Sequence, residues 1–331
     1  MRTYRDPRSH FTRPLYIINC SNPNHRHWNI DLTTDSTPPK IAGIGEVLWD
    51  VISDAETFGG APANFTCHCQ SLGAHASIVS SVGHDERGSK AVSVLNANGV
   101  DTALLTVNDY ETGHVLVTFD KHKQPSFTIK EDVAWDYIPF SADSQSHTQS
   151  IDAVCFGTLG QRSATSRKSI QQFLSATRPD CLRIFDINLR PPFYHEEIIR
   201  DSIGKANILK LNDEELHIIA PMFGLQGSES DMIQTLLSNF DLDLVALTRG
   251  SKGSLIATTH GLSEIHGRNV NVADTVGAGD AFTAAMIIGF LSQQPLQELH
   301  NFASEVAEFV CTQPGAVPDL PDSLLSSSPI R

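Results

Sequence analysis

The sequence lacks long hydrophobic runs, an excess of basic residues and closely paired cysteines. No apolar stretch in the 331 residues approaches the roughly 20 residues that a bilayer-spanning helix needs, which predicts a soluble, cytoplasmic protein. The 24 basic residues face 38 acidic ones, and the net charge of −14 argues against a nucleic-acid or membrane partner, because phosphate binding needs a basic face. The six cysteines form no C-x-x-C pair, so we expect free, buried thiols in a reducing compartment.

The first 39 residues differ from the rest of the chain in composition. They are rich in arginine, contain several Asn and Pro residues, and show no sustained helical or strand periodicity. These properties predict a disordered N-terminal extension. A transit peptide is the alternative, although such segments are richer in serine and have amphipathic spacing.

From residue 40 onward, short apolar runs alternate with stretches of helical length. The runs expected to form strands lie at 41–52, 77–82, 151–156, 182–187, 208–211 and 242–247. The last two helices are expected at 278–291 and 296–311. This alternation predicts an α/β fold in which helices cover both faces of a mostly parallel sheet.

Residues 104–130 interrupt this alternation, because three short strand-like runs follow one another there without a helix between them. The turn at 121–125 is typical of a β-hairpin. A small β-subdomain inserted in an α/β core usually acts as a lid or a subunit contact. An ordinary antiparallel sheet edge is the alternative. We expect the main domain to cover residues 40–322, followed by a C-terminal tail at 323–331.

The strongest motif, DTVGAGDAF at 274–282, runs directly into an apolar helix. Small residues at a helix start leave backbone N–H groups unpaired, and together with the helix dipole these groups form a site for phosphate. Asp280 lies inside this positive region, so we expect its carboxylate to remain ionised and to accept a hydroxyl proton. The alternative is that Asp280 only complements the dipole and the glycines only permit the turn.

Two other glycine-containing segments fail as nucleotide loops. In GHDERGSK, at 83–90, the serine precedes the lysine, whereas a P-loop lysine directly follows a glycine. Gly43-Ile44-Gly45 is followed by Leu48, where a dinucleotide-binding fingerprint needs its third glycine. A Rossmann dehydrogenase is therefore the weaker interpretation.

A second motif, GGAPAN at 59–64, precedes an expected helix at 65–72. Paired glycines let a ligand approach the backbone, and Asn64 offers both a donor and an acceptor to a polyol. A plain loop before a helix start is the alternative.

In this order, the motifs resemble the two signatures of the ribokinase/PfkB sugar kinases. GGAPAN, with Leu72-Gly73 and residues 81–88, resembles the N-terminal signature, and residues 274–282 resemble the C-terminal one. The resemblance extends over roughly residues 40–322. It implies a ribokinase-like three-layer sandwich with a mostly parallel central sheet and a small β-sheet lid. In several family members this lid also joins two subunits, so a homodimer is expected.

The resemblance also implies roles for matching residues. Asp280 corresponds to the catalytic base. The backbone amides of the anion hole correspond to three small residues, Gly277, Ala278 and Gly279. The positions that bind the sugar correspond to Asp50, Gly60 and Asn64.

Nucleotide and magnesium contacts are implied at two further elements. Asn212 and Glu215 resemble the family's N-x-x-E element, which helps to hold Mg²⁺ and the ATP phosphates through water; a capped helix start is the alternative. Thr248 and Gly250 resemble a turn that binds nucleotide phosphate, with a plain hairpin as the alternative.

Two weaker correspondences complete the implied site. Arg190, in the D-x-N-x-R sequence at 186–190, is similar to the arginine of fructokinase-like members and is expected to meet phosphate or substrate; a surface ion pair is the alternative. Asp274, the Val276 carbonyl and the turn at 313–316 match a region that binds K⁺ in some relatives.

The resemblance therefore implies an ATP-dependent kinase that phosphorylates a primary hydroxyl of a small sugar with Mg²⁺. Fructose is the expected sugar, because the sequences GEVLWD and D-x-N-x-R are similar to those of fructokinases. Ribose and 2-keto-3-deoxygluconate remain alternatives. A nucleoside kinase on the same fold and a non-catalytic regulator that binds sugar or nucleotide are further alternatives.

Overall fold

The computed structural model describes residues 37–52, 55–119 and 125–330. Almost all of the N-terminal extension expected at 1–39 therefore lies outside the described residues, as do residues 121–124 of the hairpin turn expected at 121–125.

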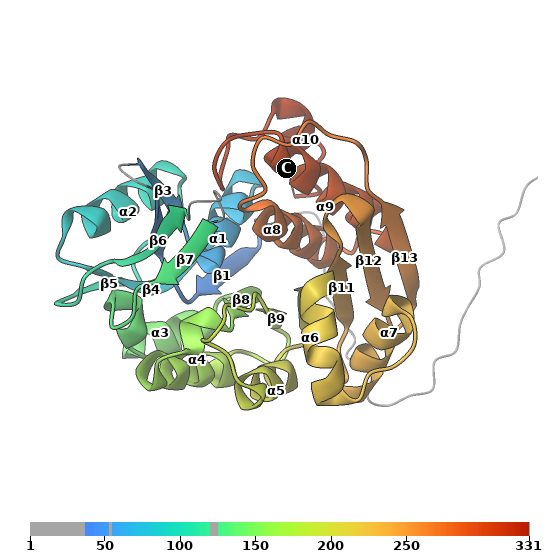
Figure 1. Ribbon diagram of the computed structural model, residues 1–331, viewed down its shortest axis with the longest axis horizontal. Helices are drawn as coiled ribbons and strands as arrows, with labels where there is room; N and C mark the ends of the chain where they lie inside the picture. The colour runs from blue at the N-terminus through green and yellow to red at the C-terminus, as the bar shows by residue number, and fades with distance from the viewer. Residues whose placement is uncertain (1–36, 53–54, 120–124, 331) are drawn as a thin grey trace, which may run out of the picture. The chain divides into compact units, whose positions relative to one another are not determined.

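A nine-stranded sheet forms the centre of the domain, in the order β13-β12-β11-β10-β9-β8-β1-β4-β5 (Figure 1). Its seven strands from β11 to β5 are parallel to one another, and β12 and β13 are antiparallel. The expected mostly parallel α/β sheet is thus confirmed. The strands are β1 (Lys40–Ile44), β4 (His75–Gly83), β5 (Leu105–Asn108), β8 (Ala153–Gly157), β9 (Leu182–Asp186), β10 (Ile208–Asn212), β11 (Leu244–Thr248), β12 (Gly253–Thr258) and β13 (Gly261–His266).

Helices cover both faces of this sheet because its strands are apolar on both sides. Along β4, Ile78 packs in one apolar cluster with residues of α1 and α2, and its neighbour Val79 packs in another with residues of α4 to α7. The helices on the Ile78 side are α1 (Ala61–Ser71) and α2 (Glu86–Ala97), with α8 (Ala278–Leu291) packed on α1 and α9 (Leu296–Cys311) packed on α8. Those on the other side are α3 (Ala142–Thr148), α4 (Ala164–Ala176), α5 (Glu196–Lys205), α6 (Asp213–Phe223) and α7 (Glu229–Asn239), and a short α10 (Asp322–Ser326) lies near the C-terminus.

The described residues can be compared with two expectations from the composition, which concern membrane-spanning helices and free cysteines. Among the described residues, no helix combines the length and the apolarity needed to cross a membrane. The five cysteines in this part of the chain are free thiols, and four of them are buried. Burial raises the pKa of the Cys67 thiol to about 12, so this thiol stays protonated and unreactive at neutral pH.

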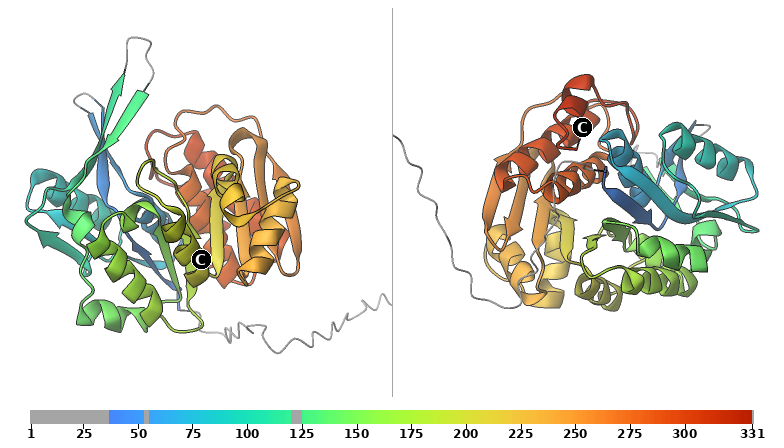
Figure 2. Two further views of the ribbon diagram at one scale, coloured as in Figure 1. Left: turned by 60° about the horizontal axis from the view of Figure 1, so that its bottom comes forward. Right: turned by 180° about the vertical axis from the view of Figure 1, so that it is seen from behind.

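A second, four-stranded sheet, the candidate lid, extends away from the helical layers (Figure 2). Its order is β3-β2-β6-β7, with β2 (Leu48–Ile52), β3 (Ala55–Gly59), β6 (Gly113–Phe119) and β7 (Pro125–Ile129). Strand β2 pairs with β3 and β6, and β6 pairs with β7. The small second β-sheet implied by the resemblance is therefore present, and its action as a lid stays a prediction.

The lid is not the single insert expected at 104–130. Its first two strands come from residues 48–59, and the run that begins at Leu104 forms β5, which pairs with β4 at the edge of the large sheet. The apolar run at 41–52, in which Gly43 and Gly45 were expected to be breaks, divides at Gly45 into β1 and β2. Gly45 has φ of 147°, and a side chain there would lie 2.9 Å from the Pro62 ring, so the chain can turn from one sheet to the other only with glycine.

Candidate active site

The start of α8 has the geometry of an anion-binding site. Gly277 caps the helix with φ of 77°, and a Cβ there would lie 2.2 Å from the Ala316 carbonyl oxygen, so only glycine fits. The N–H of Ala281 donates to the Gly277 carbonyl at 2.8 Å. Since the first N–H groups of a helix have no acceptor within it, those of Gly279 and Asp280 remain available for an anion.

Asp280 lies in the first turn of α8 and is half-buried. Burial and the nearby Asp186 carboxylate raise the pKa of Asp280 to about 7, against the lowering effects of Asn64, Lys210 and Arg190. The expectation that the helix dipole keeps this carboxylate fully ionised therefore needs correction. Near neutral pH the group is close to half protonated, which suits a general base.

Asn64 contacts the base directly. Its Nδ2 donates a hydrogen bond of 2.9 Å to Oδ2 of Asp280, across 216 residues of sequence. The first turns of α1 and α8 thus meet, and the packing of these two helices holds them together. The Asn64 Oδ1 atom is buried and has no hydrogen-bond partner within the described residues, so it is available to a ligand hydroxyl. Sequence reasoning placed Asn64 in the sugar loop but did not predict its contact with Asp280.

A buried ion pair lies at the same place and was not predicted from the sequence. Lys210 in β10 contacts Asp186 in β9, with 3.0 Å between Nζ and Oδ2, and the two residues are 7% and 3% exposed. They are partners in the parallel register of β9 and β10, so their side chains leave the same face of the sheet. In the sequence, the feature that could have indicated this buried pair is the lysine inside the apolar run ILKLN at 208–212.

Arg190 is exposed and acts electrostatically on several carboxyl groups of the site. Its guanidinium lowers the pKa of Glu46, Asp50 and Asp280, and it donates to the Leu189 carbonyl at 3.0 Å. Within the described residues it forms no ion pair, so the surface-pair alternative is not what the structure shows. Its remaining donors are free for phosphate or substrate.

Glu46 is a further buried carboxyl group that sequence reasoning missed. The residue is 2% exposed, and its Oε2 atom has no hydrogen-bond partner in the described part of the chain. Burial raises the pKa of Glu46 to about 7, against the lowering effects of its backbone contacts and of Arg190. The backbone carbonyl of Glu46 leaves room only for glycine at position 60, because a Cβ on residue 60 would lie 2.5 Å from the Glu46 carbonyl oxygen.

Asp50 lies on the face of the lid strand β2 that carries Ile52. It pairs in register with Val115 of β6, and burial raises its pKa. The adjacent Trp49 points to the opposite face, because side chains alternate along a strand. The Arg190 guanidinium lowers the pKa of Asp50 and also that of Asp280, so this lid residue and the candidate base share one charged neighbour.

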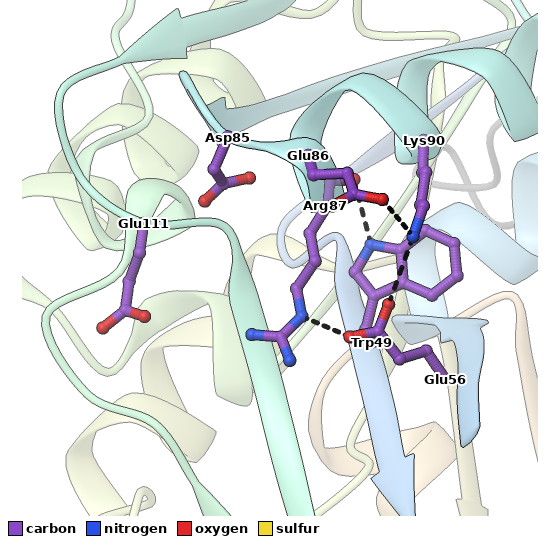
Figure 3. A pocket seen from close by; sticks show the side chains of 7 residues that line it. All are labelled: Trp49, Glu56, Asp85, Glu86, Arg87, Lys90 and Glu111. Atoms are coloured by element: carbon purple, nitrogen blue, oxygen red, sulfur yellow. Dashed lines mark hydrogen bonds and ion pairs between the residues drawn. The ribbon is translucent and has the colours of Figure 1, made fainter. Parts of the chain in front are cut away.

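A hollow of about 840 Å³ lies on the Trp49 side of β2 (Figure 3). Arg87 and Lys90 of α2 form ion pairs with Glu56 of β3, at 2.9 and 3.8 Å, and Lys90 also pairs with Glu86 along α2 at 2.8 Å. Its lining residues are Trp49, Glu56, Asp85, Glu86, Arg87, Lys90 and Glu111. None of the expected site residues lines this hollow, so it is separate from the candidate active site.

The N-x-x-E element forms a reciprocal helix cap at the start of α6. Asn212 Oδ1 accepts from the Glu215 N–H, and Glu215 Oε2 accepts from the Asn212 N–H, both at 2.8 Å. Glu215 Oε1 also accepts from the Leu189 N–H at 2.8 Å. The capped-helix alternative is therefore correct for the local geometry. Since both carboxylate oxygens already hold N–H groups, Glu215 suits a hydrated cation rather than direct coordination.

Thr248 ends β11 beside Asn212, its partner in the register. The following Gly250 has φ of 53°, and Arg249 forms ion pairs with Glu264 and Glu229. Thr248, Asn212 and Asp186 therefore end neighbouring parallel strands, at the edge where open α/β sheets bind ligands.

Asp274 joins two turns near the start of α8. Its Oδ1 atom accepts from the Val276 N–H at 3.0 Å, and Oδ2 accepts from the Gly315 N–H at 3.2 Å. The turn at 313–316 that was expected to meet Asp274 therefore does so. Because each carboxylate oxygen keeps a second lone pair, the arrangement is compatible with a cation beside it.

Comparison with known proteins agrees with this geometry. The family described as pfkB family carbohydrate kinase matches residues 30–323. An uncharacterized sugar kinase from Pyrococcus horikoshii is 31% identical over 297 residues, which cover 83% of this chain and 91% of the relative. Its crystal structure has a TM-score of 0.75 and covers 87% of this chain and 97% of its own, and it has also been solved in complex with ATP.

Two fructokinases are more distant. Fructokinase-2 of Oryza sativa is 26% identical over 86% of this chain and 91% of its own length. A fructokinase from Vibrio cholerae O395, solved with fructose, ADP and calcium, is 24% identical with a TM-score of 0.74 over 88% of this chain and 99% of its own. The similarity to the V. cholerae structure shows that the two chains share the ribokinase-like fold. The chain therefore belongs to the PfkB family of carbohydrate kinases and is an ATP-dependent sugar kinase.

Proposed function

We propose that this kinase phosphorylates a primary hydroxyl of fructose, with Asp280 as the base. The observation that carries the proposal is the position of Asp280, a carboxyl group of pKa about 7 placed directly beside the free N–H groups of α8. Three carboxyl groups, Glu46, Asp50 and Asp280, interact with the single guanidinium of Arg190. The Lys210–Asp186 pair adds one charge of each sign, so carboxyl groups still outnumber basic groups, and this favours a neutral sugar over an acidic one such as 2-keto-3-deoxygluconate.

The chain's own residues then account for most of the reaction. The sugar hydroxyl attacks the γ-phosphorus of ATP, the bond to ADP breaks, and Asp280 takes the hydroxyl proton. The N–H groups of Gly279 and Asp280 face the charge that develops on the transferred group, with Gly277 and Ala278 shaping the hole. Asn64 orients Asp280, and Arg190 supplies donors to the phosphate or the sugar.

Two cations complete the proposed site. Glu215 and Asn212, near Thr248 and Gly250, would hold Mg²⁺ through water, and the ion would supply positive charge to the ATP phosphates. K⁺ is proposed beside Asp274, where a carboxylate and the carbonyl groups of the turns provide oxygen ligands. The V. cholerae fructokinase has also been solved, as a double mutant, with potassium bound.

The test of the function is an ADP-release assay with Mg-ATP against fructose, ribose, 2-keto-3-deoxygluconate and adenosine. We expect kcat/KM for fructose to exceed the others by about tenfold or more. Preference for another sugar would overturn the choice of fructose and keep the kinase, whereas adenosine as the best acceptor would support the nucleoside-kinase alternative. Binding of fructose and ATP without turnover would support a regulator.

The pH dependence of kcat/KM should report the ionisation of Asp280. A general base acts only when it is deprotonated, and the pKa of this group is raised to about 7. Activity should therefore be full above this pH and fall about tenfold per pH unit below it. Circular dichroism at each pH is the control for unfolding. An acid limb near pH 4, the ordinary range of a carboxyl group, would contradict the environment assigned to Asp280.

Asp50 should bind the sugar and not the nucleotide. Asp50→Ala should raise the sugar KM by about 10- to 100-fold, the loss expected for a partly buried hydrogen-bonding carboxylate, and leave the ATP KM unchanged. Glu56→Ala, in the neighbouring strand β3 but on the opposite face, is the matched control and should change neither constant. A rise in the ATP KM for Asp50→Ala would mean that the sugar pocket is misplaced.

The lid is proposed to join two subunits as well as to cover the sugar. Ile52 and Phe127 are 42% and 65% exposed and share, with Val117, the lid face that carries Asp50. A second lid would remove this apolar surface from water. Light scattering should give about twice the chain mass of 36.1 kDa, and Phe127→Glu should give a monomer. A wild-type monomer at micromolar concentration would refute the dimer.

A further inference from the structure

The PfkB motifs do not explain why a lysine occupies the interior of a central strand. Lys210 lies between Leu209 and Leu211, which are fully buried, and its ammonium contacts both carboxylate oxygens of Asp186, at 3.0 and 3.2 Å. Desolvating such a pair costs several kcal/mol per ion, and apolar replacements of buried pairs are often neutral or stabilising. Stability alone therefore gives no reason for a buried ammonium at this position.

The ammonium has hydrogen-bonding capacity left over and lies against the anion hole. It carries three donors, and in the described part of the chain its hydrogen bonds go to Asp186 alone. A methyl group placed on Gly279 would lie only 3.0 Å from Nζ. Lys210 therefore lies beside the first turn of α8, where the N–H groups of Gly279 and Asp280 await an anion.

The surrounding charges keep this ammonium protonated. Burial lowers the pKa of Lys210, but the carboxyl groups of Asp186, Glu215 and Asp280 outweigh it and hold the pKa above its ordinary value. These three carboxyl groups come from β9, α6 and α8, the elements that converge on the site. The ammonium is thus a fixed positive charge at the place where phosphoryl transfer needs one.

We propose that Lys210 is a catalytic residue whose ammonium donates a hydrogen bond to the transferring phosphoryl group from the sheet side of the anion hole. Asp186 is the positioning residue that holds Nζ in place. This inference rests on the proposed function, which places phosphoryl transfer at the start of α8. Lys210 keeps its proton throughout, because the hydroxyl proton goes to Asp280 as the new O–P bond forms and the bond to ADP breaks.

The competing explanation is that Lys210 only neutralises Asp186. The double variant Asp186→Asn with Lys210→Met separates the two, because it removes both charges together and leaves no unpaired buried ion. If Lys210 is only a counter-ion, the double variant should recover the activity that Lys210→Met loses. If Lys210 contacts the phosphoryl group, the double variant should fold normally and remain slow.

The experiment measures kcat and the binding of a transition-state analogue, ADP with aluminium fluoride, Mg²⁺ and fructose. For both the single and the double variant we expect kcat to fall by about 10²- to 10³-fold, the effect of removing one donor from an oxyanion hole. Affinity for the analogue should fall to a similar extent, while affinity for ADP alone changes by about threefold or less. Lys210→Arg should recover part of both.

Lys252 is an exposed lysine in the turn between β11 and β12. Lys252→Met is the control and should behave as the wild type. Recovery of kcat by the double variant, or an equal loss of affinity for ADP and for the analogue, would overturn the proposal. If Asp280→Asn retained its kcat, the proposed site itself would be wrong. If Lys210→Met had a normal kcat while Asp280→Asn was inactive, the proposed role of Lys210 would be refuted and the proposed site would stand.

Discussion

Asp280→Asn should lower kcat by about 10³-fold or more while the affinities for ATP and sugar stay within about threefold of the wild type. Asparagine has nearly the shape of aspartate and preserves a hydrogen-bonding side chain beside Asn64, but it cannot accept the hydroxyl proton. The free N–H groups at the start of α8 remain, so the anion hole should still bind phosphate. Steady-state kinetics and calorimetry with each substrate provide the two measurements.

The alternative role of Asp280, as a charge that only complements the helix dipole, predicts a different result. Loss of such a charge costs about 0.3–1 kcal/mol of helix stability and should leave kcat intact. Glu298→Gln provides a matched control, because Glu298 is an acidic residue in the first turn of α9. A small fall in melting temperature for both variants, with kcat unchanged in both, would show that Asp280 is not the base.

Asn64→Asp should move the acid limb of the kcat/KM profile upward by about one to two pH units. The Asn64 Nδ2 atom lies 2.9 Å from Oδ2 of Asp280 and stabilises its charged form. An aspartate there would replace a donor with a second carboxyl group, and two carboxyl groups at this distance share a proton. Asp280 would then be protonated at pH 7, so activity at that pH should fall by about 10- to 100-fold and recover at alkaline pH.

Asn64→Ala is the companion variant because it removes the hydrogen bond without adding a charge. Asn64→Ala also removes the Oδ1 acceptor proposed for the sugar, so its sugar KM should rise, whereas Asn64→Asp keeps an oxygen there. Only Asn64→Asp should show the large displacement of the acid limb. If both variants keep the limb of the wild type, then either Asp280 is not the titrating base or Asn64 does not contact it in solution.

Features with a local cause could be predicted from the sequence. The alternation of apolar runs predicted the parallel sheet, and α8 and α9 have the bounds expected from their apolar patterns and flanking residues. The small residues before α8 predicted a phosphate-binding helix start, and Gly277 adopts the positive φ that only glycine takes without strain. Helix starts, turns and strand periodicity depend on neighbours within a few residues, which a sequence displays directly.

The lid and the electrostatics of the site depended on contacts between distant segments. Residues 48–59 join 113–129 in one sheet, and no local pattern distinguishes this pairing from a single insert at 104–130. The predicted ionisation of Asp280 considered only the helix dipole, whereas its pKa depends on burial and on Asp186 from another strand. A pKa reflects all charges within a few ångströms, whatever their separation along the chain.

The fold class, the two motif loops and the candidate base follow from the amino-acid sequence. Three features of the site follow from tertiary packing: Asn64 donates to Asp280, Lys210 is buried against Asp186, and Arg190 acts on several carboxyl groups without an ion pair in the part of the chain that the structure describes. The physical reason is that parallel strands and packed helices bring together residues far apart in sequence. Local preferences act within each segment, but the chemistry of this site arises where the segments meet.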